Sequence, residues 1–193
     1  SVELVTDQDL DFSQEYQTAR TPWITSQIVG SNVFDLFRVI TLSHGNPTNY
    51  EFKIAIEDIK PAGTVPGSVY GSFTLTVRRV DQDRIQGSPF LAVTDSDIRP
   101  NVVEQFQNVN LDPDSPNYIA RLIGDKFTTV DSTGKVFRNG DYNNNSKYIR
   151  IDVADRVKDK SIDVSLLPFG FRALQNPLGP NLVIPDVAFV ESQ

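Results

Sequence analysis

Acidic residues at two-residue spacing are the side chains of this sequence best suited to chemistry. They form the pairs Asp81/Asp83 and Asp95/Asp97, which flank a short apolar run, and the triple in Asp7-Gln-Asp-Leu-Asp11. Two carboxylates can act as general acid and general base when their surroundings separate their pKa values. Both pairs lie in turn-like surroundings, so solvated turns are favoured over a catalytic pair. A glycosidase built on acidic pairs would need two such carboxylates in one cleft.

The acidic triple also has the alternating spacing of oxygen ligands in a calcium loop. It departs from the EF-hand pattern, because the sixth position is Phe12 instead of glycine and the twelfth is Thr18 instead of glutamate. The loop 139–146 is rich in Asn and Gly, which tolerate a left-handed backbone, and could hold a cation or a sugar. A plain exposed loop explains both stretches more simply, so we predict no metal site.

No other arrangement of residues indicates catalysis. His44 is the only histidine, and it stands beside Gly45 without a nucleophile motif such as G-x-S-x-G. The sequence also lacks cysteine, a phosphate-binding glycine loop and a dinucleotide fingerprint. We therefore predict a protein that is not an enzyme, with no catalytic residues and no cofactor.

Charge and composition argue against two classes of partner. The formal charge of the 193 residues is −7, and the densest basic pair is Arg78-Arg79, so no nucleic-acid surface of clustered Lys and Arg is indicated. No apolar run approaches the roughly 20 residues that span a bilayer, and the first residues show no signal pattern. We predict neither nucleic acid nor membrane as a partner.

Methionine and cysteine are both absent from the chain. Because the sequence begins at Ser1 and contains no methionine, we expect a processed or excised piece of a longer protein. The absence of cysteine excludes disulfides and cysteine metal sites. A chain of 193 residues can nevertheless bury a core without such cross-links.

The elements that must position these residues are mostly strands. Aspartate makes up 19 of the 25 acidic residues, and it favours turns and caps over helix interiors. Alternation of apolar and polar residues predicts half-buried strands, whereas a run that is apolar on both faces predicts a central strand at 33–42. The other expected strands are 52–57, 72–77, 102–111, 127–130, 135–138 and 149–153, with 162–167 as a further candidate. Turns or surface loops are expected at 45–49, 60–68 and 131–134.

This pattern predicts an α+β, predominantly β fold. We expect a mixed or antiparallel sheet or sandwich with one or two short helices and long surface loops. Residues 1–30 are expected to form an N-terminal arm packed on the core, with Trp23 as its anchor. Residues 31–167 form the β-rich core domain, and 168–193 form an extended C-terminal segment, because its four prolines prevent a long regular element.

Residues 115–124 combine several signals for a short helix. Ser115 suits the N-cap, Pro116 the first helical position and Gly124 the stop. An apolar stripe recurs one turn apart and should pack on the sheet: Tyr118, Ile119, Leu122 and Ile123. The outer face is left to Asn117, Ala120 and Arg121. So short a helix is not stable alone, so the sheet must hold it.

The segment 102–125 resembles a stretch of the contractile-tail sheath proteins of myophages, which carry an ESF-x-N-(L/V)-x-L-D-P-x-S-x-N-Y-(I/V) type run. The matching residues are Glu104, Phe106, Asn108, Leu111, Asp112, Pro113, Ser115, Asn117 and Tyr118. Two upstream stretches occur in the expected order. Residues 19–27 resemble the TPWI-x-S stretch of sheaths from large phages. Residues 36–45 with Asn49 resemble their LF-x-(F/I)-x-T-L-S-D-G-x-x-x-N strand and turn, with His44 in place of Asp.

The resemblance implies a structural subunit of a contractile tail sheath, carried in the virion and assembled in the host bacterial cytoplasm. Many copies would stack as helical rings around the tail tube and repack during contraction to drive genome delivery. The implied partners are other sheath subunits and the tail tube. The motif residues would then be structural: Asp112, Pro113, Ser115, Pro116, Asn117, Tyr118 and Gly124.

A β-sandwich adhesin or carbohydrate-binding module is the alternative, with Trp23, Tyr142 and the asparagine loop as its surface. Glycan binding would separate the two hypotheses, because a sheath body should show none. The fragment alone is expected to be monomeric. Its remaining contacts should each lie below the roughly 1,000 Å² of a stable interface, and its charge of −7 opposes self-association.

Overall fold

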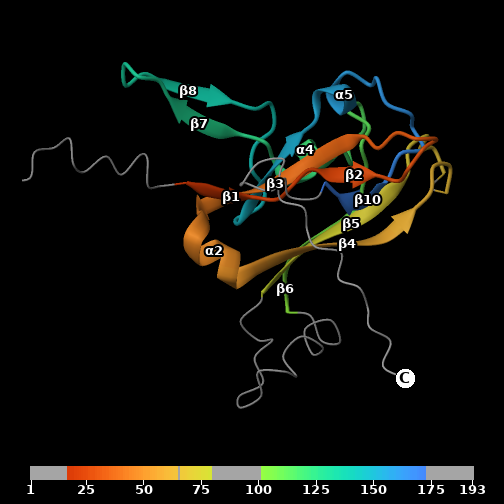
Figure 1. Cartoon of the computed structure of the whole chain (residues 1–193), viewed down its shortest axis with the longest axis horizontal. Coiled ribbons are helices and arrows are strands. Elements are labelled where there is room, and N and C mark those ends of the chain that lie inside the picture. The colour runs from red at the N-terminus through yellow and green to blue at the C-terminus, as the bar shows by residue number, and fades with distance from the viewer. Residues whose placement is uncertain (1–16, 65, 80–100, 173–193) are drawn as a thin grey trace, which may run out of the picture.

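The computed structural model describes residues 17–64, 66–79 and 101–172. In this part of the chain, ten strands form three antiparallel sheets (Figure 1). The largest sheet is built around β3 (Asp35–His44), which pairs along one edge with β1 (Thr18–Arg20) and β2 (Ile24–Ser26). Strand β9 (Ile149–Val153) pairs with the other edge of β3, and β10 (Pro168–Phe171) extends the sheet beyond β2.

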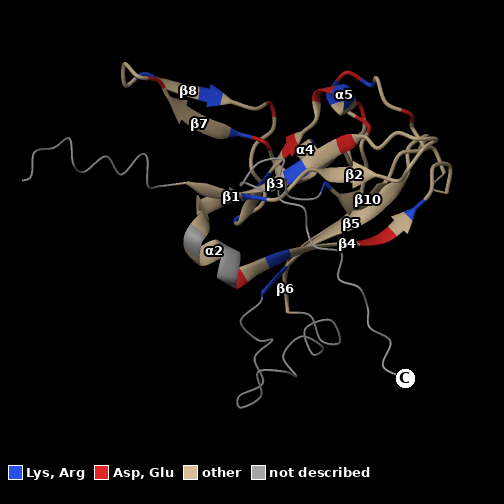
Figure 2. Ribbon diagram, viewed as in Figure 1, with Lys and Arg blue, Asp and Glu red and all other residues tan. Residues whose placement is uncertain are grey.

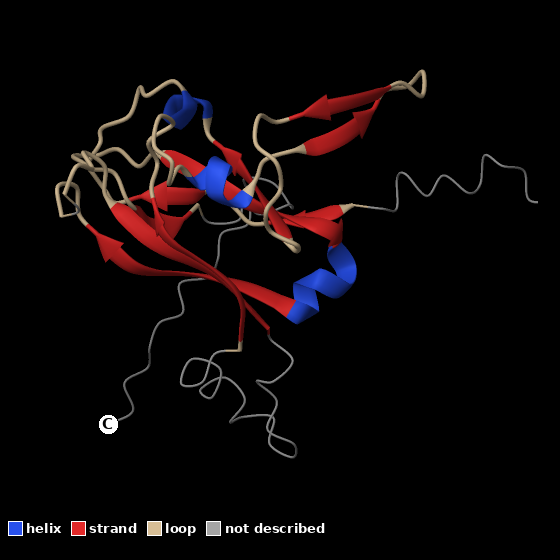
Figure 3. Cartoon of the chain, turned by 180° about the vertical axis from the view of Figure 1, so that it is seen from behind, coloured by secondary structure: helices blue, strands red, loops and turns tan. Residues whose placement is uncertain are grey.

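The second sheet has three strands, and the third is a hairpin. In the second sheet, β5 (Ser72–Arg79) lies between β4 (Phe52–Lys60) and β6 (Val102–Val109). The hairpin consists of β7 (Phe127–Val130) and β8 (Val136–Asn139) and projects from the body of the molecule (Figure 3). The predicted α+β, predominantly β, antiparallel fold class is therefore confirmed.

The core lies between the two larger sheets. Phe37 of β3 and Phe73 of β5 stack there with their ring centroids 5.8 Å apart. Most other buried side chains of the core come from β3, β5, β9, the end of β6 and the segment after it: Leu36, Val39, Leu75, Val77, Val109, Leu111, Tyr118, Ile119, Ala120, Ile123, Ile149, Ile151 and Val153. Val157, Ile162 and Leu166 complete the cluster. Burial of each such side chain contributes about 1.5 to 3 kcal/mol, so this cluster supplies most of the drive to fold.

Strands β3 and β9 match their sequence patterns. Leu36, Phe37, Val39 and Ile40 are buried although they point to both faces of β3, which confirms the expected central strand. In β9 the apolar residues are buried and the polar residues between them are half-buried, which confirms the predicted alternation.

The half-buried pattern predicted for residues 72–77 is wrong, because β5 is buried on both faces. Neighbouring strands flank it on both edges, and carboxylates of β4 lie over its polar face. Thr76 Oγ1 donates a hydrogen bond to Glu57 Oε2 at 3.1 Å, and Thr74 Oγ1 donates one to Asp58 Oδ2 at 3.4 Å. The threonine hydroxyls are thus buried without losing hydrogen bonds.

Two further expectations are corrected. The segment 45–49 does not form a plain turn but belongs to the helix α2 (Gly45–Glu51). Thr48 Oγ1 donates to the carbonyl of His44 at 2.7 Å, and the backbone of Ala19 lies 2.6 Å from where a Cβ on Gly45 would stand. This helix therefore needs glycine at its start. The candidate strand 162–167 is a turn, in which the Ser165 amide donates to Asp163 Oδ1 at 2.8 Å.

Strand β6 contains an irregularity that the sequence pattern does not show. Phe73 pairs with Val109 and Leu75 with Phe106, so β6 holds one residue more than β5 over this interval. Asn108 takes a left-handed conformation there, with φ of 53°. Asparagine tolerates this conformation better than most residues, and a bulge bends the strand toward the segment that follows.

Residues 18–26 and 168–171, expected in terminal segments, supply strands to the largest sheet. The acidic triple at 7–11 and the pairs at 81/83 and 95/97 lie outside the described residues, as do the ends of both terminal segments. None of the described helices is long and apolar enough to cross a membrane.

Candidate functional site

The motif residues lie in one compact segment, residues 110–124, which we name the turn–helix unit. The backbone of Asn110 closes the loop that forms the first part of this unit. The Asn110 amide donates to the carbonyl of Asn117 at 2.9 Å, and the Ile119 amide donates to the carbonyl of Asn110 at 3.0 Å. These bonds form a short parallel bridge between Asn110 and Tyr118. The loop between them is therefore closed on itself at the end of β6.

Polar side chains fill the inside of this loop. Ser115 Oγ accepts hydrogen bonds from Asn110 Nδ2 at 2.8 Å and from the Asn117 amide at 3.1 Å. The Ser115 amide donates to the Asp112 carbonyl at 3.0 Å, and the Asp112 amide donates to Asn110 Oδ1 at 3.3 Å. Pro113 and Pro116 occupy turn positions in which they need not donate. These side chains hold the backbone, and no reactive arrangement results.

The helix α4 spans Ile119–Ile123, so the prediction that it begins at Ser115 is wrong. Tyr118 precedes the first helical residue with an extended ψ of 133° and caps it with no side-chain hydrogen bond. The bridge to Asn110 holds Tyr118 in this extended conformation. Ser115 therefore accepts hydrogen bonds within the preceding turn and does not cap the helix. This role depends on the side chain of Asn110.

The apolar stripe of α4 packs as expected, with one correction. Tyr118, Ile119 and Ile123 are buried, and Leu122 is half-buried against the core. Ala120, assigned to the outer face, is buried as well. The cause is that α4 contacts both β9 and β6, so the sheets cover more than one face of it.

Gly124 ends α4 in a conformation and a space that only glycine can occupy. Its φ is 114°, and its amide donates to the Ala120 carbonyl at 2.9 Å. A Cβ at this position would meet the backbone of Asn144 and would stand 2.7 Å from the carbonyl oxygen of Asn143. The loop 140–147 thus passes directly over the end of the helix.

The same loop caps the helix from outside. The amides of Asn145 and Ser146 donate to the Ile123 carbonyl at 2.8 and 3.1 Å, and Asn145 Nδ2 donates to the carbonyl of Leu122 at 3.1 Å. Asn145 and Ser146 therefore satisfy carbonyl groups that a helix end leaves without partners, whereas the side chains of Asn143 and Asn144 bond to Lys126. The cation or sugar site considered from the sequence is not needed to explain them.

Glu104 of β6 fastens this loop to the second sheet. Its Oε2 accepts from Ser146 Oγ at 2.5 Å, and its Oε1 accepts from the Lys147 amide at 2.9 Å. Ser146 Oγ in turn accepts from the amides of Tyr148 and Ile149 at 3.1 and 3.0 Å. One carboxylate thereby fixes the start of β9 relative to β6.

Tyr118 is buried inside the turn–helix unit. Burial raises the pKa of the Tyr118 hydroxyl well above its ordinary value, and the nearby Tyr142 raises it further. The two rings meet edge to face with centroids 5.9 Å apart. The guanidinium of Arg121 lies 5.3 Å from the ring centre of Tyr142 on the outside. Tyr142 is therefore committed to packing within the protein.

An ion pair connects the turn to the loop that follows α5. Lys160, in the loop after α5 (Asp155–Lys158), contacts the carboxylate of Asp114 and lies 4.0 Å from that of Asp112. The hydrogen bond to Asp114 raises the pKa of the Lys160 ammonium. Because both side chains are exposed, this pair adds little to stability, but it orients the loop.

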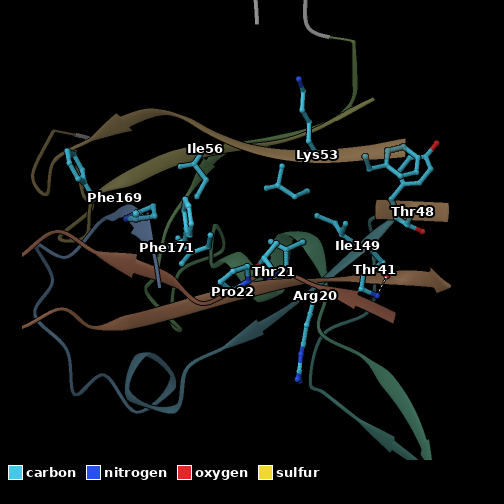
Figure 4. A pocket seen from close by; sticks show the side chains of 18 of the residues that line it. Arg20, Thr21, Pro22, Thr41, Thr48, Lys53, Ile56, Ile149, Phe169 and Phe171 are labelled. Carbon is cyan, nitrogen blue, oxygen red and sulfur yellow. Dashed lines mark hydrogen bonds between the residues drawn. The ribbon is translucent and has the colours of Figure 1, made fainter. Parts of the chain in front are cut away.

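A cleft of about 660 Å³ opens between the two larger sheets (Figure 4). Its walls are mainly apolar side chains of β4, β9, β10 and the segment around β1, including Ile54, Ile56, Ile149 and Pro168. Figure 4 shows that the charged ends of Arg20 and Lys53 point away from it. Among the described residues that line the cleft, none therefore places a charged group in it.

Trp23, the other aromatic residue considered for a sugar site, lies beside a separate hollow. The guanidinium of Arg38 covers its ring at 4.6 Å from the centroid, and Arg38 Nε donates to Asp152 Oδ2 at 2.7 Å. This hollow is lined by neither Tyr142 nor the asparagine loop. The structure therefore does not bring the three proposed sugar-binding elements together in it.

His44 stands at the end of β3, where its Nδ1 lies 3.2 Å from the carbonyl oxygen of Gln17. Across the residues that the structure describes, no three His, Cys, Asp or Glu side chains are grouped to hold a metal ion.

No protein family, curated protein or solved structure matches this chain. The interpretation of the turn–helix unit therefore depends on its own residues and geometry.

Sequence reasoning missed several residues on which the unit depends. These residues are Asn110, Asn145 and Ser146. Their hydrogen-bond partners cannot be recognised from the residues beside them in the sequence. Ser146, for example, bonds to Glu104, which is 42 residues away. A usable signal did exist for the loop. Its run of asparagines follows a glycine-ended helix by fewer than 20 residues, and asparagine side chains commonly satisfy free backbone groups.

Proposed function

We propose that this chain is a rigid structural domain of a contractile-tail sheath subunit. In this role, many copies stack as helical rings around the tail tube in the virion and repack as bodies during contraction. The partners are other sheath subunits and the tube, and assembly takes place in the host bacterial cytoplasm. The proposal rests on the resemblance of three stretches of sequence and on what the residues of those stretches do in the fold.

The observation that carries the proposal is that the motif residues lock the backbone. Asp112, Ser115 and Asn117 bond to one another or to Asn110, and Gly124 is covered by the 140–147 loop. A subunit that transmits force needs such a body, because stress on a soft domain would deform it instead of moving its neighbours. Residues that fix the backbone in this way need not form a catalytic site.

The positions of the three stretches also support the proposal. The stretch 19–27 contains β2, which pairs with β3 of the stretch 36–45. The third stretch contains α4, which contacts β9 on the other edge of β3. Three stretches that are separate in the sequence thus lie together in one packed body.

Electron microscopy of virions from the source of this sequence tests the proposal. Antibodies raised against the purified chain should label the tail along its length, in both extended and contracted particles. Label on the capsid, on a fibre tip or on no part of the particle would contradict it.

A carbohydrate-binding module is the second candidate, because Trp23 borders a hollow of about 730 Å³ that also contains Arg38 and Asp152. Aromatic rings beside hydrogen-bonding groups are suited to sugars. Arg38 covers one face of the ring, however, which leaves less surface for stacking. A glycan array with the purified chain separates the candidates: reproducible binding that Trp23→Ala abolishes would favour the module over the sheath.

A further inference from the structure

The cleft between the two larger sheets lies between their edge strands β4 and β10. In the described part of the chain, each of these strands is the last of its sheet and has one neighbouring strand. Residues of both line the cleft, and Figure 4 shows Ile56 and Phe171 reaching into it from its two sides. Proteins commonly cover sheet edges with another segment of chain. The cleft is therefore a place where a further segment can pack.

Large apolar side chains at the mouth of this cleft are exposed. Phe169 and Phe171 of β10 are 75% and 68% exposed, and Ile59 of β4 is 37% exposed. All three line the cleft, and β10 contains no charged residue (Figure 2). Exposed apolar surface that gathers around a hollow marks a site of contact. An occupant that covers these side chains must itself be apolar.

The hydroxyl groups in the wall of the cleft are already bonded to the protein's own backbone. They belong to Thr21, Thr41 and Thr48. The Thr41 hydroxyl, for example, accepts from the Ala19 amide at 2.9 Å and donates to the Ser43 carbonyl at 3.0 Å. A polar or charged ligand would lose its water in this cleft without gaining hydrogen bonds from these hydroxyls. The wall thus favours an apolar occupant for a second reason.

The described part of the chain ends at the rim of the cleft. Arg172 directly follows Phe171, and its amide donates to the carbonyl of Trp23 at 2.8 Å. Another 21 residues, 173–193, follow in the sequence, and only Asp186 and Glu191 among them are charged. Seven of the nine residues 182–190 are apolar. We name these nine residues the apolar run. Its composition matches a cleft in which no charged group of the described lining is placed.

The other long segments outside the described ranges match the cleft less well. Residues 1–16 contain five carboxylates and no Lys or Arg. Residues 80–100 contain six charged side chains. Burial of a charge without a partner is costly, so both segments would lose free energy on entering an apolar cleft. Composition therefore selects the apolar run as the occupant.

We propose that the apolar run 182–190 packs into the cleft of its own chain and covers the edges of β4 and β10. The cleft volume of about 660 Å³ lies within the range of roughly 300 to 1,000 Å³ that holds a compact apolar ligand, so several side chains fit. Pro185 has no amide hydrogen to donate, which is tolerated at the edge of a sheet.

The connection to β10 is long enough for this contact and makes it intramolecular. Residues 173–181 can span up to roughly 30 Å. The cleft follows β4 from Phe52 to Ile59, which is roughly 25 Å in a strand. Because the run is joined to the sheet that forms one wall, its effective concentration at the cleft is on the order of millimolar. A contact that would be weak between separate chains can therefore be well populated within one chain.

The chain contains no cysteine, so one introduced thiol reports whether the run is covered. Full-length chains with Val187→Cys or Asn176→Cys are labelled with a maleimide. If the run is docked for about 90% of the time, the thiol at 187 reacts about tenfold more slowly than the thiol at 176, outside the run. Urea at a concentration that unfolds the protein should remove this difference. Equal rates without urea would overturn the proposal.

Dilution separates docking within one chain from docking between copies. The slow labelling at position 187 should be unchanged over a hundredfold dilution, because the run and the cleft belong to the same molecule. Protection that disappears on dilution would mean that a second copy supplies the run, and would overturn the proposal.

A change in the wall tests whether the cleft is the place of docking. Phe171→Lys, added to the Val187→Cys chain, places a charge in the wall and should bring the labelling rate to within about threefold of the rate at position 176. Val69→Lys is the matched control, since Val69 is 67% exposed and is not among the described residues of the lining. It should leave the labelling slow. Circular dichroism confirms that both variants fold. Protection that persists in Phe171→Lys, or is lost equally in both variants, would overturn docking in this cleft.

This contact and the proposed function can fail separately, because docking within one chain does not depend on the role of the protein. Slow labelling at position 187 without antibody label on tails would contradict the sheath proposal alone. Label on tails with fast labelling at position 187 would contradict only the contact between the run and the cleft.

Discussion

The turn–helix unit and the β7–β8 hairpin are separated by only two residues in sequence, yet they are stabilised in opposite ways. Residues 110–124 are closed by long-range hydrogen bonds and by buried side chains of α4. The hairpin has four exposed residues in β7 and is held by its own ladder and its loop. The unit is thus determined by the rest of the protein, whereas the hairpin is determined locally.

This difference separates a region on which the fold depends from a region that contributes little to it. The hairpin projects from the body of the molecule (Figure 1), and Val130 and Val136 on it are 63% and 59% exposed. Changes in the unit should therefore lower the free energy of unfolding strongly, whereas changes at the exposed positions of the hairpin should lower it little.

The largest contrast is expected from two glycines. Gly124→Ala places a Cβ against the backbone of Asn144 at a φ of 114°, and should lower the free energy of unfolding by about 4 kcal/mol. Gly134→Ala in the hairpin loop has a similar positive φ of 79° but nothing within 4 Å, so its cost should be about 1 to 2 kcal/mol. Urea denaturation of both variants measures the difference, and equal losses would mean that the loop 140–147 does not press on the helix end.

Side-chain truncation should give the next largest contrast. Ile123 is fully buried, so Ile123→Ala should cost about 2 to 5 kcal/mol. Val136 is 59% exposed, so Val136→Ala should change the free energy of unfolding by less than about 0.5 kcal/mol. A large loss for Val136→Ala would show that the valine side of the hairpin packs on the body.

The two regions also differ in how far the sequence predicts them. The hairpin was predicted from the four-residue loop 131–134, which ends in glycine between two short strands, because its pairing is local. The stop at Gly124 was also predicted, since glycine is favoured where φ is positive. The start of α4 was predicted wrongly, because the bridge to Asn110 overrides the helix signals of Ser115 and Pro116.

Buried polar residues account for other differences between prediction and structure. Thr74 and Thr76 look like solvent-facing residues of a half-buried strand, yet both are buried beneath carboxylates of β4. The partner of Glu104 is 42 residues away, so no local pattern reveals it. Sequence patterns predict which residues are apolar enough to bury, but not which polar groups find partners in the fold.

Removal of one serine hydroxyl from each region should change stability by smaller amounts. Ser115→Ala removes an acceptor of two hydrogen bonds and leaves Asn110 Nδ2 without it, which should cost about 1 to 2 kcal/mol. Ser132→Ala at the exposed hairpin tip should cost less than about 0.5 kcal/mol. Thermal unfolding of both variants gives the comparison. An unchanged midpoint for Ser115→Ala would indicate that water replaces its hydroxyl and that the turn is less closed than described.

The smallest effect is a local response of the hairpin to acid. Hydrogen bonds from the Thr133 side chain and the Lys135 amide hold the pKa of Asp131 below its ordinary value of 3.8. Because the folded pKa is lowered, the support that this carboxylate gives to the loop is complete above the unfolded pKa and is lost as pH falls through the folded value. The amide signals of Thr133 and Lys135 in a two-dimensional NMR titration should therefore shift below about pH 4, toward the positions found in Asp131→Asn. Amides of Ile119 and Leu122, which bond within the turn–helix unit, should keep their positions over that range. A shared midpoint for all four amides would instead mean that the protein unfolds as one body, and that the hairpin is no more independent than the unit beside it.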